Sequence, residues 1–196
     1  MKIAIVGYSG SGKSTLAKFL SEFYGVKVLY LDTVHWLPNW RERDREDSAR
    51  LVKEFLDKEA ENGWVIDGNY GKLCFDRRMD EADEIVFLNF NRFTCLRRAF
   101  RRKKEYKGSA RESMTEGCNE RVNWEFFWWL LWSGRVKRRR DKFKRLVEKY
   151  AKKTVVLKNQ KQLDLYKNKL SAAKNSVEIG EINCVERRGE PETNKR

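Results

Sequence analysis

The residues with the clearest chemical pattern lie near the start of the chain, between Gly7 and Ser14. They read GYSGSGKS and match the phosphate-loop pattern G-x-x-x-x-G-K-[ST] at each fixed position. Glycines let the backbone turn tightly, so that successive N–H groups point at a bound anion. We expect Lys13 to reach the β- and γ-phosphates of ATP and the Ser14 hydroxyl to bind Mg²⁺. The predicted loop residues are Gly7, Ser9, Gly10, Ser11, Gly12, Lys13, Ser14 and Thr15.

Two aspartates follow short apolar runs that we predict to be buried parallel strands. Asp32 comes after the run at 26–31 (VKVLYL), and Asp67 comes after the run at 64–66 (WVI). In open α/β sheets, ligands bind at the carboxyl ends of the strands. We therefore expect Asp67 to hold Mg²⁺ together with Ser14, and Asp32 to orient or deprotonate an acceptor hydroxyl. The alternative for Asp32 is that it caps the turn that follows.

Polar and aromatic side chains come soon after each aspartate. His35 and Trp36 follow the first aspartate, while Asn69 and Tyr70 follow the second. We expect these four side chains to contact the acceptor substrate, with Trp36 and Trp40 as flat walls of its pocket. The alternatives are simple packing of the rings and ordinary turn chemistry at the asparagine.

The positive charge of the chain is concentrated in one third of its length. The net charge is +14, and the segment 92–153 alone holds 21 Lys and Arg against 7 Asp and Glu, so the remainder is neutral. This excess predicts an anionic partner for the segment, or else a solvated basic face. Arg92 follows a predicted strand at 84–90, and further arginines lie in predicted helices at 93–106 and 135–150.

The elements that must position these side chains alternate between strands and helices. We predict strands at 2–6, 26–31, 64–66, 84–90 and 154–157, and helices after the loop and at 44–59, 72–81, 93–106, 135–150 and 163–170. Such alternation predicts a three-layer α/β fold of the P-loop type, with helices on both faces of a five-stranded parallel sheet. We expect one domain at 1–170, a mobile loop at 107–119 and a polar, loosely ordered tail at 171–196.

An aromatic run at 124–132 (WEFFWWLLW) is the most apolar part of the chain. It is too short to span a membrane, which takes about 20 residues as a helix. Written as a helix, it is apolar on two sides, and such a helix is buried on two sides. We expect it to pack between the core and a lid, or to form the contact of a homodimer.

Composition narrows the class of protein further. The chain has 196 residues, 37% of them charged, and contains no apolar run long enough for a membrane span, so no membrane partner is expected. Its four cysteines lie far apart and it has one histidine, which excludes the usual zinc patterns. We expect reduced thiols and a cytoplasmic location.

Residues 1–167 resemble the bacterial proteins called DNA topology modulation proteins, which look like adenylate kinase-like P-loop kinases. The resemblance rests on GYSGSGKST, LDTVHWLP, WVIDGNY and FLNFNRFTCLRR, and on the aromatic run and VVLKNQKQLD. It implies a strand order 2-3-1-4-5, a helical lid rich in arginines, and an adenine site at Lys158, Asn159 and Gln160. The segment after Ser171 lies outside the resemblance.

Together, these patterns predict an ATP- and Mg²⁺-dependent kinase that acts on a small molecule such as a nucleoside or nucleotide. Arg92, Arg135 and Arg139 are the candidates to stabilise the transferring phosphoryl group, and Arg98 to contact the substrate. One alternative is a nucleic-acid-binding protein regulated by ATP that turns over no small molecule, although no standard reader motif is visible. For the kinase, weak nucleic-acid binding through 92–153 is the expectation. Another is a nucleotide-dependent structural protein that uses its tryptophan-rich helix as an interface.

Overall fold

The structure is a computed structural model that describes residues 1–106, 112–118 and 124–187. Contacts divide the chain into two units, one of Met1–Lys158 and one that begins at Asn159. The first unit holds the sheet and every site residue predicted before Asn159.

A five-stranded parallel sheet forms the centre of the first unit, in the order β2-β5-β1-β6-β7. This is the order 2-3-1-4-5 of the five predicted strands, so the fold class is confirmed. β1 is central and its residues from Ile3 to Val6 are fully buried. The strands are β1 Lys2–Gly7, β2 Lys27–Tyr30, β5 Trp64–Asp67, β6 Glu84–Leu88 and β7 Thr154–Leu157.

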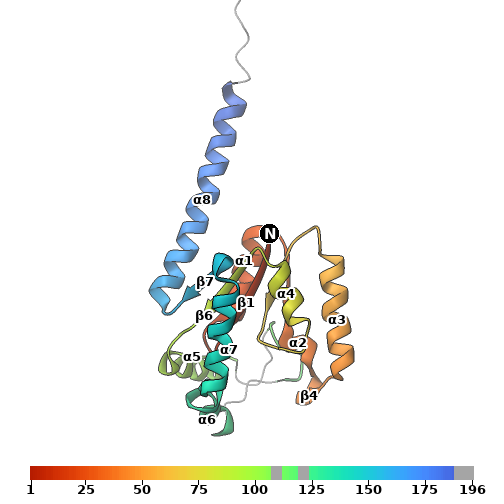
Figure 1. The fold of residues 1–196 in the computed structure, drawn as a ribbon. Coiled ribbons are helices and arrows are strands. Elements are labelled where there is room, and N and C mark those ends of the chain that lie inside the picture. Colours follow the sequence, from red (N-terminus) through yellow and green to blue (C-terminus); the bar gives the residue numbers. More distant parts are fainter. Residues whose placement is uncertain (107–111, 119–123, 188–196) are drawn as a thin grey trace, which may run out of the picture. The chain divides into compact units, whose positions relative to one another are not determined.

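The register of the sheet determines how far along the strand direction each site residue lies. Asp67 pairs with Ile5 on one side and with Tyr30 on the other, while Gly7 pairs with Leu88. The loop after Gly7 therefore begins just beyond the level of Asp67. Figure 1 shows the N-terminus at the opposite end of the sheet from α2, β4 and α6.

Helices lie on both faces of the sheet, as right-handed crossovers require. In Figure 1, α4 and α7 lie in front of the sheet and α1 lies behind it. The helices of this unit are α1 Lys13–Tyr24, α2 Leu31–His35, α3 Arg45–Lys58, α4 Phe75–Glu81, α5 Arg92–Glu105, α6 Trp124–Leu131 and α7 Lys137–Lys149, with 3-10 turns η1 Pro38–Trp40, η2 Ser133–Arg135 and η3 Ala151–Lys153.

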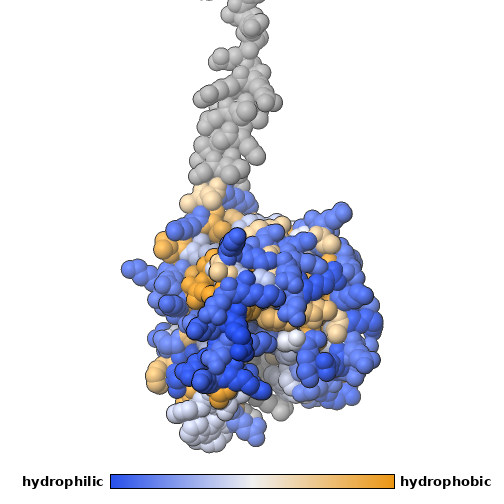
Figure 2. Space-filling view, in the orientation of Figure 1, coloured by the Kyte–Doolittle hydropathy of each residue, from blue (hydrophilic) through white to orange (hydrophobic). Residues whose placement is uncertain are grey.

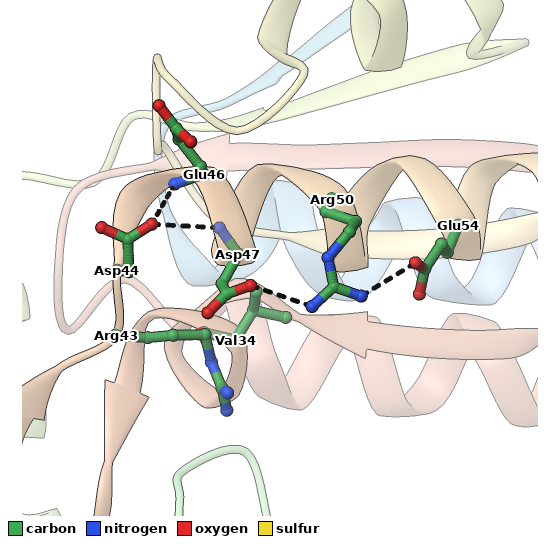
Figure 3. A network of polar contacts seen from close by, with 7 residues as sticks. All are labelled: Val34, Arg43, Asp44, Glu46, Asp47, Arg50 and Glu54. Carbon is green, nitrogen blue, oxygen red and sulfur yellow. Dashed lines mark hydrogen bonds and ion pairs between the residues drawn. The ribbon is translucent and has the colours of Figure 1, made fainter.

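The start of α3 shows how local sequence fixes a helix boundary. The Asp44 carboxylate accepts hydrogen bonds from the backbone N–H groups of Glu46 (2.8 Å) and Asp47 (3.3 Å), as Figure 3 shows. These are two of the donors that a helix leaves free in its first turn. Further along the helix, Arg50 forms ion pairs with Asp47 and Glu54.

A small hairpin around Pro38 lies in the chain between α2 and α3. Strands β3 Trp36–Leu37 and β4 Arg41–Glu42 pair antiparallel across η1. Asn39 and Trp40 both have positive φ angles, 62° and 61°, which are rare for residues other than glycine. Two-residue strands carry too little pattern for the sequence to reveal them.

The aromatic helix α6 is buried on one side only, so the expectation of burial on two sides is not met within this unit. Leu130 and Leu131 are buried, whereas Trp124, Trp128 and Trp132 are 70%, 44% and 53% exposed. The exposed residues are spaced four apart, which places them on one helical face. Their rings contact one another along that face.

In the second unit, the described residues form the helix α8, Gln160–Arg187. It extends well past the predicted end at Leu170, into the segment expected to be a loosely ordered tail. That segment contains alanine, lysine and glutamate, which favour helices, and no proline before Pro191. In the part of the chain that the structure describes, no helix has the length and apolar character needed to cross a membrane.

Candidate active site

The phosphate loop begins where β1 ends and leads directly into α1. A Cβ atom added at Gly7 would lie 2.5 Å from the carbonyl oxygen of Leu88, and one added at Gly10 would lie 2.5 Å from that of Cys95. Both glycines also have positive φ angles. The loop is thus pressed against β6 and α5 with no room for side chains, which explains these two glycines of the motif.

The N-terminus of α1 points its free N–H groups into this loop. Gly12 occupies the cap position in a left-handed conformation, and no side chain caps the helix there. Lys13 Nζ donates a hydrogen bond to the carbonyl of Tyr8 (3.1 Å), so its ammonium group lies over the loop. Uncapped N–H groups, the helix dipole and a lysine together form a site for a phosphate.

A hydroxyl and a carboxylate meet beside this site. The Ser14 hydroxyl donates a hydrogen bond to Asp67 Oδ2 (2.6 Å), and Asp67 is only 6% exposed at the end of β5. Two oxygen ligands of this kind fit Mg²⁺, which usually takes one or two protein oxygens and completes its shell with phosphates and water. Among the described residues, no group of three or more His, Cys, Asp or Glu is placed to hold a metal ion by itself.

The Asn69 amide holds the loop at its first residue. Its Oδ1 accepts from the Gly7 N–H (2.9 Å), and its Nδ2 donates to the Gly7 carbonyl (2.6 Å). These two bonds link the exit of β5 to the exit of β1. The role of Asn69 as a substrate contact stays a prediction, because this amide already binds the backbone.

A second polar pair lies on the other side of Asp67. The Tyr70 hydroxyl donates to Asp32 Oδ1 (2.8 Å), and Asp32 sits in the short helix α2 that follows β2. Burial, aided by the Asp32 charge, raises the pKa of Tyr70 above its ordinary value, so the phenol remains a donor. The structure therefore places Asp32 at the carboxyl end of the sheet with one oxygen already oriented.

Aromatic rings gather beside this carboxylate. The His35 ring lies 4.7 Å from the Tyr70 ring and 4.7 Å from the Trp36 ring, measured between centroids. Trp36 in turn lies 5.5 Å from Trp40. Ring packing of His35 on Trp36 is present, and Trp36 and Trp40 contact each other edge to face, while their role as walls of a substrate pocket stays a prediction.

The segment 112–118 rests on the same hairpin, a contact that the sequence did not reveal. The Thr115 hydroxyl donates to the carbonyl of Trp36, and Cys118 Sγ donates to that of Leu37 (3.3 Å) and accepts from the Trp40 N–H (3.4 Å). This segment belongs to the predicted mobile loop 107–119, of which 107–111 and 119 lie outside the described residues.

Two of the predicted arginines reach the phosphate loop. Arg98 Nη1 donates to the carbonyl of Ser11, and its guanidinium lies 4.5 Å from the centre of the Phe90 ring. Arg135 lies 3.7 Å from the centre of the Tyr8 ring and donates to the carbonyl of Phe90 (2.7 Å). Both cations therefore border the loop, beside the proposed site of the transferring phosphoryl group.

The other two arginines lie differently. Arg139 is exposed on α7, with its guanidinium 5.5 Å from the centre of the Trp129 ring. Arg92 is half-buried at the first position of α5. Burial lowers the pKa of Arg135, and the charge of Arg92 lowers it further. Figure 2 shows hydrophilic residues over the area where α7 lies in Figure 1.

A family model described as an AAA domain matches residues 3–117, more than half of the chain. The chain belongs to this AAA domain family. The match runs from β1 to the segment at 112–118, and so includes the phosphate loop, both aspartates and the hairpin.

Comparison with solved structures supports the fold of this AAA domain. Deoxyadenosine kinase from M. mycoides with bound dATP has a TM-score of 0.52 at 16% identity, over 87% of this chain and 100% of that one. The same enzyme with dCMP and dCDP gives a TM-score of 0.49 at 16% identity, and with dCTP 0.42 at 18%, each over 88% of this chain and 100% of that chain. None of the curated proteins compared with the chain matches it.

The expected adenine site falls on the boundary between the two units. Lys158 is the last residue of the first unit, while Asn159 and Gln160 belong to the second. Asn159 Oδ1 accepts from the Gln162 N–H (3.0 Å), which is the geometry of a helix cap at the start of α8. Binding of adenine by these three residues stays a prediction.

Proposed function

We propose that this AAA domain protein is an ATP- and Mg²⁺-dependent kinase that phosphorylates a small molecule of the nucleoside or nucleotide class. The observation that carries the proposal is the line of polar groups at the carboxyl end of the sheet. The Ser14–Asp67 pair borders the phosphate loop, and the Asp32–Tyr70 pair lies on the other side of Asp67. One pair fits the metal and phosphates of ATP, and the other fits an acceptor hydroxyl.

Each residue then has a specific role in phosphoryl transfer. Lys13 and the loop N–H groups bind the β- and γ-phosphates, and Ser14 and Asp67 would hold Mg²⁺, which neutralises charge on the phosphates. Asp32 orients the acceptor hydroxyl and accepts its proton as the oxygen bonds to the γ-phosphorus. The bond between the γ-phosphorus and the bridging oxygen breaks, and ADP leaves.

The arginines beside the loop would stabilise the charge that develops on the transferred group. Arg98 and Arg135 are best placed, because both already border the loop. Arg92 can support Arg135 from the start of α5, whereas Arg139 needs a movement of its side chain away from Trp129. Fixed positive charges in a partly buried site stabilise such a transition state strongly.

The rings near Asp32 support a planar acceptor. Trp36, Trp40 and His35 present flat apolar surfaces beside a carboxylate, which suits a base joined to a hydroxylated sugar. One solved structure with a similar fold is a deoxyadenosine kinase with bound dATP, which agrees with this class of acceptor. Within the family, we place the chain with the DNA topology modulation proteins on the motifs described above.

A second candidate function is nucleic-acid binding through the segment 92–153. It is favoured by the exposed rings of Trp124 and Trp128 on α6 and of Trp132 directly after it, in the part of the chain between the basic helices α5 and α7. Aromatic rings beside cations can stack bases. The same exposed rings form the surface that we propose for a homodimer contact.

Free thiols at Cys74, Cys95 and Cys118 fit the cytoplasmic location that we propose.

A screen of acceptors tests the kinase. ATP consumption is measured with Mg²⁺ against nucleosides, nucleotides and sugars, and then with duplex and single-stranded DNA. We expect one class of small acceptor to raise ATP consumption in the wild type and not in Lys13→Ala, which keeps the fold because Lys13 faces the loop. If the protein binds ATP but phosphorylates no small acceptor, the proposed kinase activity is contradicted, and nucleic-acid binding remains as the candidate function.

A further inference from the structure

The loop that follows β5 carries two site residues and is held by an arginine that we did not predict. Arg78 lies in α4 and is fully buried. Its Nε donates to the carbonyl of Leu73 (2.8 Å), its Nη1 to that of Gly68 (3.3 Å) and its Nη2 to that of Tyr70 (2.8 Å). One guanidinium thus binds three carbonyl oxygens of the loop 68–73.

This arrangement is costly for stability and specific in geometry. A buried cation is tolerated only when hydrogen bonds or an opposite charge replace its water. Among the described residues, no carboxylate lies within ion-pair distance of Arg78, so the three carbonyls serve instead. Burial lowers the pKa of Arg78 to about 10, which still leaves it charged at neutral pH. Apolar side chains can often replace buried charges without loss of stability, so stability alone gives little reason for an arginine here.

The geometry of the loop gives a better reason. Gly68 and Tyr70, whose carbonyls bind Arg78, flank Asn69 on both sides. The Asn69 amide holds both backbone groups of Gly7, and the Tyr70 hydroxyl holds Asp32. A guanidinium has its donors in a fixed planar fork, so it sets the directions of the carbonyls that it binds.

We propose that Arg78 is a positioning residue that acts through the loop 68–73 on both halves of the site. Through Asn69 it keeps the start of the phosphate loop in place, and through Tyr70 it orients Asp32. The second role rests on the proposed function, whereas the first can be measured without any turnover.

Hydrogen exchange tests the first role. The Gly7 N–H is bonded to Asn69 and lies outside α4, so its protection reports on the loop at a distance. We expect Arg78→Lys to speed exchange at Gly7 and across 68–73 by about tenfold or more. Arg77→Lys is the matched control, because Arg77 is the next residue and forms ion pairs with Asp57 and Glu81. Val52→Ala, at a buried position in α3, controls for a general loss of stability.

The second role is tested by a double-mutant cycle with Tyr70→Phe, which removes the hydrogen bond to Asp32. We expect each single variant to lower kcat by about 10- to 100-fold, and the double variant to be little worse than either one, because both act through the same contact. If Arg78→Lys does not fold, the variant Arg78→Gln, which replaces the guanidinium with an amide, takes its place in both experiments.

Two results would overturn the proposal. One is an exchange rate at Gly7 and across 68–73 that is no faster in the Arg78 variant than in Arg77→Lys or Val52→Ala. The other is a double variant whose loss of kcat is the product of the two single losses. If the wild type turns over no acceptor, the kinase is wrong, and exchange at Gly7 still decides whether Arg78 positions the loop.

Discussion

The Ser14 hydroxyl donates to Asp67 Oδ2 across 2.6 Å, although the two residues are 53 positions apart in the chain. The parallel sheet brings them together, because β1 and β5 are neighbours and end at the same edge. The contact leaves one hydroxyl and one carboxylate side by side next to a helix N-terminus.

Asp67→Asn tests the metal site that we derive from this pair. The amide keeps the size of the side chain and a hydrogen-bond partner for Ser14 but removes the charge that attracts Mg²⁺. We expect the Mg²⁺ concentration for half-maximal activity to rise by about 10- to 100-fold, with a smaller change in ATP affinity without metal.

The matched control for this substitution is Asp57→Asn, on the surface next to Arg77. It removes the same charge far from the phosphate loop, so the Mg²⁺ dependence should stay at the wild-type value. An Asp67→Asn protein with an unchanged Mg²⁺ requirement would assign Asp67 to structure alone.

Asp32→Asn tests the base for the acceptor. The amide can still accept from Tyr70, but it cannot take a proton from the hydroxyl. We expect kcat to fall by about 10²- to 10⁴-fold while the affinity for ATP stays nearly constant. Steady-state kinetics with the acceptor found in the screen provides the measurement. A variant with wild-type kcat would show that Asp32 is not the base for the acceptor.

The sequence predicted the sheet and half of the site for a clear physical reason. Buried strands and the glycine loop depend on short local patterns, and the topology of a parallel sheet then places Asp32 and Asp67 at one edge. No local sequence pattern distinguishes Arg78, because the sequence around this buried arginine does not differ from that around the half-buried Arg77 beside it. Its role depends on carbonyl groups, which every residue has.

Contacts between distant segments were also beyond prediction. Thr115 and Cys118 hold the hairpin by side-chain bonds to backbone atoms, and a threonine or cysteine in a polar loop does not indicate a partner. Trp124 and Trp128 are more exposed than we expected. The burial of a helix depends on which element packs against it, and an apolar pattern in the sequence does not identify that element.

Asp44→Ala tests a stability contribution away from the site. The mutation removes the side-chain cap of α3, and we expect Tm to fall by about 2–4 °C, whereas Asp44→Asn, an equally good cap, should change Tm little. Hydrogen bonds from the N–H groups of Glu46 and Asp47 hold the pKa of Asp44 below its ordinary value. The lowered pKa means that the stabilisation by the charged cap is present above the unfolded-state value of about 3.9 and is lost as pH falls through the folded value.

Thermal unfolding between pH 3 and pH 8 measures both effects. The difference in Tm between the wild type and Asp44→Ala should be constant above about pH 5 and shrink below about pH 4. A difference that grows at low pH would mean that the cap acts through another group.

The arginines separate the kinase from the nucleic-acid function. A kinase needs a few arginines, each aimed at a phosphate oxygen, so substitutions should have very unequal effects. Arg98 and Arg135 border the phosphate loop, whereas Arg138 and Arg140 are exposed on α7. We expect lysine at either of the first two positions to lower kcat by about 10²- to 10³-fold, and lysine or glutamine at the exposed positions to change it little.

A nucleic-acid surface predicts the opposite pattern for glutamine variants. Each cation then neutralises one backbone phosphate, so every loss weakens binding modestly and lowers the salt slope by about one. The deciding measurement is DNA affinity as a function of salt, with and without ATP and Mg²⁺, for the wild type and for Arg140→Gln. Since 21 basic residues in 92–153 exceed what one phosphoryl group needs, we expect weak binding that disappears by about 0.2 M salt whether or not ATP is present. Tight, sequence-preferring binding at physiological salt that depends on ATP would instead make nucleic-acid binding the main function.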